Sequence, residues 1–253
     1  MLRKTLILSS LVALTAAGSM AEPMRTRLTR ENQFPGLGKA ETSFQYYHQD
    51  YDSGVSVDRF EVDGRYGVYE NLTLRAGLPV VQSDLAGSSE TGLGDLYIGA
   101  ELLAFEDIFR YPFVIPHVDL MLPTGDDDKG LGRGETSLEA GVSVGTTIYD
   151  QLTFIADATY AFNGGFAQDS DEDVYYLSGS ILWDVSTRFA VLLEGRIWEE
   201  NEFNDSPYQY LGGMIYEFTD DLTMGVYGGQ FREDAFGIET TADLALVRFG
   251  YEF

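Results

Sequence analysis

The 253-residue sequence contains no cysteine and only two histidines. A chain without cysteine folds without disulfides, so its stability must come from one large cooperative framework. The absence of thiols also excludes a cysteine nucleophile, and no serine is flanked by the residues of a nucleophile elbow. The sequence therefore predicts neither an enzyme nor a cofactor-binding protein.

Basic residues are scarce, because 16 Lys and Arg stand against 41 Asp and Glu and the formal net charge is −25. Without Arg3 and Lys4, which precede the cleavage position proposed below, the net charge becomes −27. Such a chain repels phosphate, which excludes nucleic acid as a partner. Three reasons for this acidity stay open. They are plain solubility, loops that bind divalent cations at a lipopolysaccharide surface, and an interior that favours cations.

Long hydrophobic runs are absent after the first twenty residues. Arg3 and Lys4 precede an apolar run over residues 6–17, and Ser19-Met20-Ala21 offers small residues where a signal peptidase cleaves. The run is too short to serve as a stable membrane anchor. The sequence therefore predicts an exported chain with a secretory signal peptide over residues 1–21.

Apolar and polar residues alternate along most of the remaining chain. A period of two is typical of a strand with different surroundings on its two faces, and 28 glycines disfavour long helices. About twelve segments have a length that suits tilted membrane strands. The predicted fold is all-β, a transmembrane antiparallel up-and-down β-barrel of about 12 strands over residues 40–253. The segments lie near residues 41–51, 60–68, 72–78, 95–102, 111–122, 137–144, 153–160, 177–183, 189–198, 208–216, 222–228 and 245–253.

Short turns and long loops follow one another along the chain. Glu70-Asn71, Asp150-Gln151 and Asp220-Asp221 each precede an apolar–Thr–apolar strand start, and residues 184–189 form a looser copy. These tight turns are typical of the periplasmic end of a barrel. A soluble β-sandwich would not segregate its short connections in this way. We therefore place at the cell exterior the long acidic connections, residues 83–93, 125–135, 163–173, 199–206 and 232–240.

The final strand places Phe249, Tyr251 and Phe253 on one face. Aromatic side chains at a strand end suit a membrane interface. The pattern resembles the C-terminal signal of bacterial outer-membrane barrels, which the barrel-assembly machinery reads. This resemblance implies location in the outer membrane of a Gram-negative bacterium, with membrane lipid, lipopolysaccharide and that machinery as partners.

Residues 22–39 do not have the pattern of a strand. This basic N-terminal segment carries Arg25, Arg27, Arg30 and Lys39 against Glu22 and Glu31. A flexible periplasmic tail is the preferred interpretation. The alternative is that the segment folds into an acidic lumen as a partial plug.

Charged residues within the predicted strands should face the lumen. A basic residue at mid-membrane on the lipid face costs roughly 2–4 kcal/mol, so the alternation forces such residues inward. A network of paired charges filling a closed lumen and a water-filled passage that orients a solute are both open. The candidate lumen-lining residues are Asp63, Arg65, Arg75, Glu101, His117, Asp119, Glu139, Asp157, Glu194, Arg196 and Glu217.

Apolar residues also fall on the predicted inner face, which suits either an amphipathic solute or a packed plug. These residues are Ile155, Leu182, Leu192, Trp198, Leu211, Ile215 and Tyr227.

Acidic residues also gather in the predicted loops. Residues 126–128 and 169–173 lack the Gly and terminal Glu spacing of a calcium-binding loop, so no dedicated metal site is predicted. Loose cation bridges to lipopolysaccharide phosphates are the alternative to plain solvation. Asp95, which follows Gly94, is expected to take part in turn chemistry, with a place at the pore mouth as the alternative.

The stretch over residues 91–145 carries a family resemblance. Gly92-Leu93-Gly94-Asp95-Leu96 opens one strand, and a proline-containing strand ends in Leu122-Pro123-Thr124-Gly125-Asp126. This layout resembles the barrel family named "Putative MetA-pathway of phenol degradation", with Leu78-Pro79 fitting the same pattern. The resemblance implies uptake of aromatic or apolar compounds through the outer membrane.

These observations favour an outer-membrane channel for passive uptake of small, aromatic or apolar molecules. One alternative is a closed structural or surface-binding barrel whose N-terminal segment plugs it. A minor alternative is an outer-membrane hydrolase that uses His48 near Asp50.

Overall fold

The computed structural model describes residues 25–52, 54–85, 88–106, 112–163, 173–200, 207–235 and 238–253, so the predicted signal peptide lies outside the described residues. The alternating segments form the strands of one barrel wall. The strands of the wall are β1 (Ala40–Tyr51), β2 (Ser56–Tyr69), β3 (Leu72–Leu85), β5 (Leu96–Leu102), β7 (Phe113–Leu122), β8 (Ser137–Ile148), β9 (Leu152–Phe162), β10 (Val174–Ser186), β11 (Phe189–Glu200), β12 (Tyr208–Thr219), β13 (Leu222–Ala235) and β14 (Ile238–Glu252).

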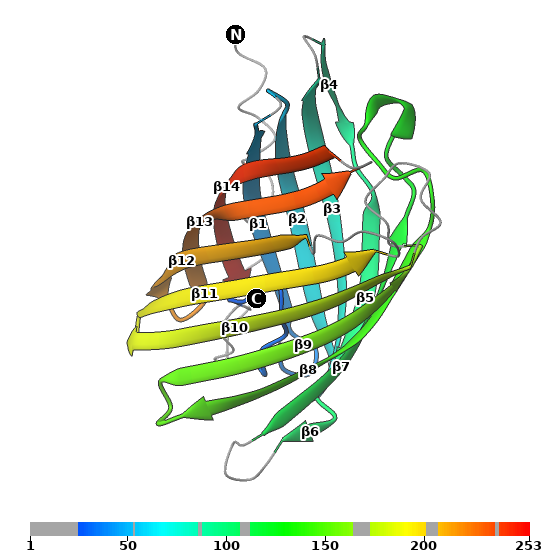
Figure 1. Ribbon diagram of the computed structural model, residues 1–253. Coiled ribbons are helices and arrows are strands. Elements are labelled where there is room, and N and C mark those ends of the chain that lie inside the picture. Colours follow the sequence, from blue (N-terminus) through cyan, green and yellow to red (C-terminus); the bar gives the residue numbers. More distant parts are fainter. Residues whose placement is uncertain are drawn as a thin grey trace, which may run out of the picture.

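The wall closes on itself. Neighbouring strands pair antiparallel in chain order, β2 pairs with both β1 and β3, and β14 returns to pair with β1. β1 is the closing strand, since Glu41, for example, lies opposite Arg65 of β2 on one side and Glu252 of β14 on the other. The strands are strongly tilted against one another (Figure 1). The predicted closed barrel of twelve antiparallel strands is confirmed.

Two short strands extend the wall at its opposite ends (Figure 1). β4 (Ser88–Leu93) pairs with the end of β3, so residues 83–93 form a hairpin rather than the expected loop. β6 (Phe105–Glu106) pairs with the start of β7, at the end of the wall where the tight turns lie. Among the described residues, the helical structure is a single short 3-10 turn, η1 (Asp127–Lys129), and no helix could cross a membrane.

The tight turns explain how adjacent strands keep their register. Tyr149 and Asp150 both have φ of 55°, and the Gln151 N–H donates to the Ile148 carbonyl at 3.2 Å. Positive φ at both central residues is the geometry that matches the twist of a two-residue hairpin. The turn is therefore centred one residue earlier than the Asp150-Gln151 pair that the sequence indicated.

The outer surface of the wall is apolar. Leu193 is 54% exposed while its neighbour Leu192 is 1% exposed, and the same alternation recurs along the strands. Exposed aromatic residues lie toward both ends, including Trp183, Tyr216 and Phe249 at one end and Tyr175 and Tyr210 at the other. Apolar side chains between aromatic girdles are the surface that a lipid bilayer requires.

Candidate functional site

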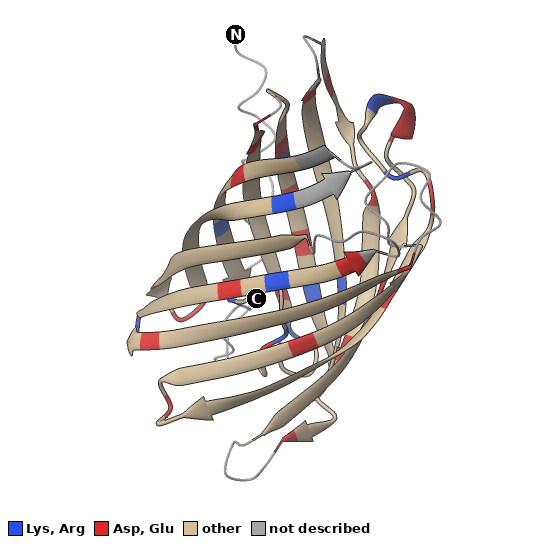
Figure 2. Ribbon diagram, in the orientation of Figure 1, with Lys and Arg blue, Asp and Glu red and all other residues tan. Residues whose placement is uncertain are grey.

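The eleven predicted lumen-lining residues all lie on the inward-facing positions of their strands. Seven of them are buried, and Arg75, Glu139, Arg196 and Glu217 are half-buried. Figure 2 shows acidic and basic positions on many of the wall strands, and a mixed group at η1. The buried, inward-facing charges belong to the interior of the barrel, whereas the exposed side chains on the middle of the outer wall are apolar.

A network of ion pairs covers the inner wall from β1 to β7. Arg65 donates to Glu41 at 2.7 Å and also to Glu101, and all three side chains are buried. Arg75 lies 2.7 Å from Asp119 and stacks on the ring of Tyr97 with 5.1 Å to the centroid. These pairs hold neighbouring strands together and neutralise charges that would otherwise be costly to bury.

His117 extends the network onto β9. Its Nε2 lies 2.8 Å from Asp157, while Asp119, which the sequence placed on the same face, is 4.0 Å away. Asp157 also accepts hydrogen bonds from Ser143 at 2.6 Å and Thr159 at 2.7 Å. The sequence could not reveal the His117–Asp157 pair, because the two residues are 40 positions apart.

Residues 25–34, called here the inner segment, lie inside the barrel. The Arg25 guanidinium lies 2.5 Å from Asp184 on β10. The Glu194 carboxylate accepts the backbone N–H of Arg27 at 2.9 Å and that of Leu28 at 3.1 Å. Ser180 completes the attachment, since its hydroxyl lies 2.8 Å from that of Thr29. One end of the inner segment is thus bonded to β10 and β11.

The other end of the inner segment is bonded to β8 and β7 and, across the barrel from β10, to β2. Arg30 donates its backbone N–H to Ser143 at 3.0 Å, and its guanidinium lies 3.2 Å from Asp119. The Gln33 carbonyl accepts a hydrogen bond of 2.8 Å from Arg65. The preferred sequence interpretation, a free periplasmic tail, does not describe these residues, because polar groups of the wall bind them on both sides.

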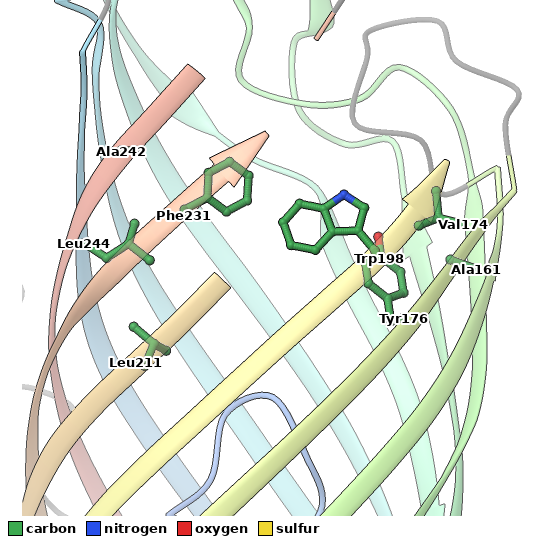
Figure 3. Packing of buried hydrophobic residues seen from close by; sticks show 8 residues of the cluster. All are labelled: Ala161, Val174, Tyr176, Trp198, Leu211, Phe231, Ala242 and Leu244. Atoms are coloured by element: carbon green, nitrogen blue, oxygen red, sulfur yellow. The ribbon is translucent and has the colours of Figure 1, made fainter. Parts of the chain in front are cut away.

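An aromatic cluster occupies the interior toward the long-loop end. Trp198 and Phe231 stack with their ring centroids 5.4 Å apart, and Tyr176 and Tyr51 extend the row at 6.3 and 6.5 Å. We call these four residues the aromatic arc. Figure 3 shows Trp198 and Phe231 projecting toward one another inside the barrel, together with their apolar neighbours. The sequence indicated Trp198 as inward-facing but did not single out its three partners.

A second apolar cluster lies toward the tight-turn end. It consists of Leu182, Ala190, Leu192, Ile215, Tyr227 and Leu246. The Tyr227 side chain covers the inward side of Gly213 and Gly225, where an added Cβ would lie 2.1 Å from a ring carbon and 2.3 Å from the hydroxyl oxygen, respectively. This cluster meets the inner segment through Tyr227, whose hydroxyl donates to the Arg25 carbonyl at 3.4 Å.

Two residues singled out in the sequence have partners other than those expected. Asp95 accepts the backbone N–H groups of Gly125 and Arg133 at 2.9 and 2.7 Å, so it holds the neighbouring loop rather than its own turn. His48 faces outward near the rim and lies 2.7 Å from Asp58, not beside Asp50. Pairing of β1 with β2 brings His48 and Asp58 opposite each other.

The acidic loops contain no metal site within the part of the chain that the structure describes. In η1, Lys129 donates to Asp126, and this hydrogen bond raises the pKa of Lys129 above its usual value. Of residues 169–173, only Asp173 is described, and it accepts a hydrogen bond from Tyr160. The rest of that cluster lies outside the described residues.

A groove on the outer wall is distinct from the lumen. Its lining includes Val144, Phe154 and Ala156 together with Gly179 and Gly195. Gly179 and Gly195 lie opposite each other on β10 and β11, so no side chains project from the wall there and its outer surface is recessed. Because the groove opens on the lipid-facing side, acyl chains rather than a solute in the lumen would fill it.

Comparison with known structures identifies other outer-membrane barrels. The COG4313 outer membrane channel from Pseudomonas putida F1 has a TM-score of 0.68 at 14% identity, covering 92% of this chain and 100% of that one. The KdgM porin gives 0.54 at 13% identity, covering 83% and 99%. The CymD monoaromatic hydrocarbon channel gives 0.51 at 8% identity, covering 86% and 89%. At these identities the likeness establishes the fold.

Comparison at the sequence level identifies the family. No curated protein sequence matches the chain. The family model described as "Putative MetA-pathway of phenol degradation" matches residues 34–236, which include every wall strand except β14 and all eleven candidate lumen-lining residues. The chain therefore belongs to this family of outer-membrane barrels.

Proposed function

We propose that this protein is a passive channel for small amphipathic molecules across the outer membrane. The observation that carries the proposal is the attachment of the inner segment by polar bonds to both walls. Charged and polar groups of the wall surround the inner segment, and such groups favour water in the space beside it. A twelve-stranded barrel is also wider than the eight-stranded kind that side chains fill.

The aromatic arc supports a solute with an apolar part. Its rings project into the lumen on the side of the long loops, where a solute from the cell exterior would arrive first (Figure 3). CymD, the structural neighbour named as a monoaromatic hydrocarbon channel, agrees with this solute class. A solute would pass the rings and then the inner segment.

Conductance and swelling measurements test the proposal. Purified full-length protein in planar bilayers should give discrete conductance steps, and liposomes that contain it should swell in small neutral solutes. Single-channel steps that increase when residues 25–34 are deleted would support a passage narrowed by the inner segment. Absence of conductance and swelling, in both the full chain and the deletion variant, would contradict a channel.

The rival function is a closed structural or surface-binding barrel. It is favoured by the number of bonds that the inner segment makes, since a plug fixed at Asp184, Glu194 and Asp119 could stay in place permanently. In that case the full chain would show no conductance in planar bilayers, and only the variant without residues 25–34 would conduct.

The outer surface of the wall indicates which partners the barrel would contact. Membrane lipid would contact the apolar belt, lipopolysaccharide would contact the acidic rim, and the barrel-assembly machinery would read Phe249, Tyr251 and Phe253.

The hydrolase alternative has little support, because within the described part of the chain no serine or threonine hydroxyl is bonded to His48. A His48→Ala variant that lost lipid or peptide cleavage would revive it.

A further inference from the structure

Three pairs of residues face each other across β10 and β11 on the inner wall. Starting from the long-loop side, Tyr176 lies opposite Trp198, Ser178 opposite Arg196, and Ser180 opposite Glu194. The order is thus an aromatic pair, then a cation, then the carboxylate that holds the inner segment. Arg196 lies at the boundary between the aromatic arc and the inner segment.

The partners of Arg196 among the described residues are neutral polar groups. Its Nε donates to the Ser178 hydroxyl at 2.9 Å and one terminal nitrogen donates to the Leu28 carbonyl at 3.2 Å. No carboxylate among the described residues lies within ion-pair distance of Arg196, unlike Arg25, Arg30, Arg65 and Arg75. Glu194, two residues away on the same face, is already occupied by the N–H groups of Arg27 and Leu28 and by Ser180.

The guanidinium therefore retains binding capacity toward the lumen. An arginine offers five N–H donors in one plane, and the two hydrogen bonds to Ser178 and Leu28 leave three of them. Its carbon Cζ lies 4.8 Å from the centroid of Tyr176, which fixes the plane of the fork against an aromatic face. A planar fork of this kind matches a carboxylate.

We propose that Arg196 and the aromatic arc together bind a small aromatic carboxylate on its way through the lumen. The ring of such a molecule would pack on Tyr176 and Trp198, and its carboxylate would accept hydrogen bonds from Arg196. This inference rests on the proposed channel function and narrows its solute class from apolar aromatics to aromatic acids. A neutral hydrocarbon would leave the remaining donors of Arg196 without an acceptor.

Tryptophan fluorescence provides a direct test, because the chain has only two tryptophans. Trp183 faces lipid and is 51% exposed, whereas Trp198 is 2% exposed and belongs to the arc. A Trp183→Phe variant thus leaves Trp198 as the single reporter. In this background, benzoate and its neutral analogue benzyl alcohol would each be titrated into the full-length protein in detergent.

We expect benzoate to change the Trp198 emission saturably and to bind at least about tenfold more tightly than benzyl alcohol, as a charge-assisted hydrogen bond allows. Arg196→Gln should remove this preference, and Arg196→Lys should restore part of it. Arg188→Gln, which alters an exposed turn at the opposite end of β11, is the matched control and should leave the preference unchanged. Heat-dependent gel mobility establishes that each variant is folded.

The inference is overturned if benzoate and benzyl alcohol bind equally, or if Arg196→Gln retains the preference for benzoate. Its failure is distinguishable from failure of the channel function. Swelling of liposomes in neutral solutes without selective benzoate binding would leave the channel intact and remove the aromatic acid. Selective binding without conductance or swelling would mean a carboxylate-binding site in a barrel that does not transport.

Discussion

The Glu194 carboxylate on β11 accepts the backbone N–H of Arg27 at 2.9 Å, which joins the barrel wall to a residue 167 positions earlier in the chain. The same carboxylate binds Leu28 and Ser180, so one buried side chain anchors the inner segment. A carboxylate that accepts hydrogen bonds from backbone N–H groups in this way anchors a segment of chain. It is not free to bind a passing solute. The stability of this attachment should control the conductance.

Glu194→Ala should loosen the inner segment. Loss of the acceptor leaves two backbone N–H groups without their partner, at roughly 1–3 kcal/mol each. Single-channel recordings should then show larger or more variable steps than the native protein. Glu139→Ala is the control, because Glu139 faces inward without a described bond to the inner segment. Equal conductance in the two variants would contradict the anchoring role of Glu194.

Arg65→Gln should destabilise the barrel strongly. Removing this cation leaves Glu41 and Glu101 buried without their main partner, and breaking a buried ion pair costs about 3–5 kcal/mol. Urea unfolding of the protein in lipid vesicles measures the loss. Arg59→Gln is the comparison, since Arg59 is half exposed, lies 4.0 Å from Glu61 and should change stability by less than about 1 kcal/mol. Similar losses in both variants would argue against the inner network.

Gly67→Ala should disturb the entry of the inner segment into β1. A Cβ at this position would lie 2.4 Å from the Pro35 carbonyl oxygen and 2.3 Å from that of Gly36, and backbone atoms cannot rotate away. Overpacking of this kind costs about 1–3 kcal/mol. Gly64→Ala, three residues earlier on the lipid-facing side, meets nothing within 4 Å and should be tolerated. Thermal unfolding of the two variants gives the comparison, and equal stability would place residues 35–36 elsewhere.

Leu193→Arg should hinder folding into lipid. Leu193 is 54% exposed on the outer wall, and a basic residue at mid-membrane costs roughly 2–4 kcal/mol. The yield of heat-modifiable protein after refolding into vesicles measures this cost. Leu193→Ala serves as the control for simple loss of the side chain. Native-like refolding of Leu193→Arg would mean that this face does not contact lipid.

The wall could be predicted from the sequence because each strand shows its own alternation of apolar and polar residues. Alternation in segments such as residues 189–198 fixes which side chains face inward, whichever strands lie beside them. The inward positions of Arg75, Asp157 and Glu194 follow from this periodicity alone. The same periodicity predicts the closed barrel once about twelve such segments are present.

Contacts between distant residues could not be predicted in this way. The inner segment is held partly through the backbone N–H groups of Arg27, Leu28 and Arg30, which every residue except proline possesses. Its basic side chains suggested an acidic lumen, but the backbone contacts leave no mark in the sequence, so the strands that hold the segment could not be predicted. The pairing of His48 with Asp58 also requires the register of β1 against β2, which the short connection after Tyr51 determines.

Cysteine crosslinking tests the central claim, that the inner segment crosses the lumen, most directly. The chain has no cysteine, and the hydroxyls of Thr29 and Ser180 lie 2.8 Å apart. In a T29C/S180C variant, a disulfide should form within the folded barrel, and reduction should alter the conductance. The T29C/S137C variant, which joins β8 at the far rim, should remain uncrosslinked. A folded T29C/S180C barrel with two free thiols after oxidation would show that the inner segment lies elsewhere.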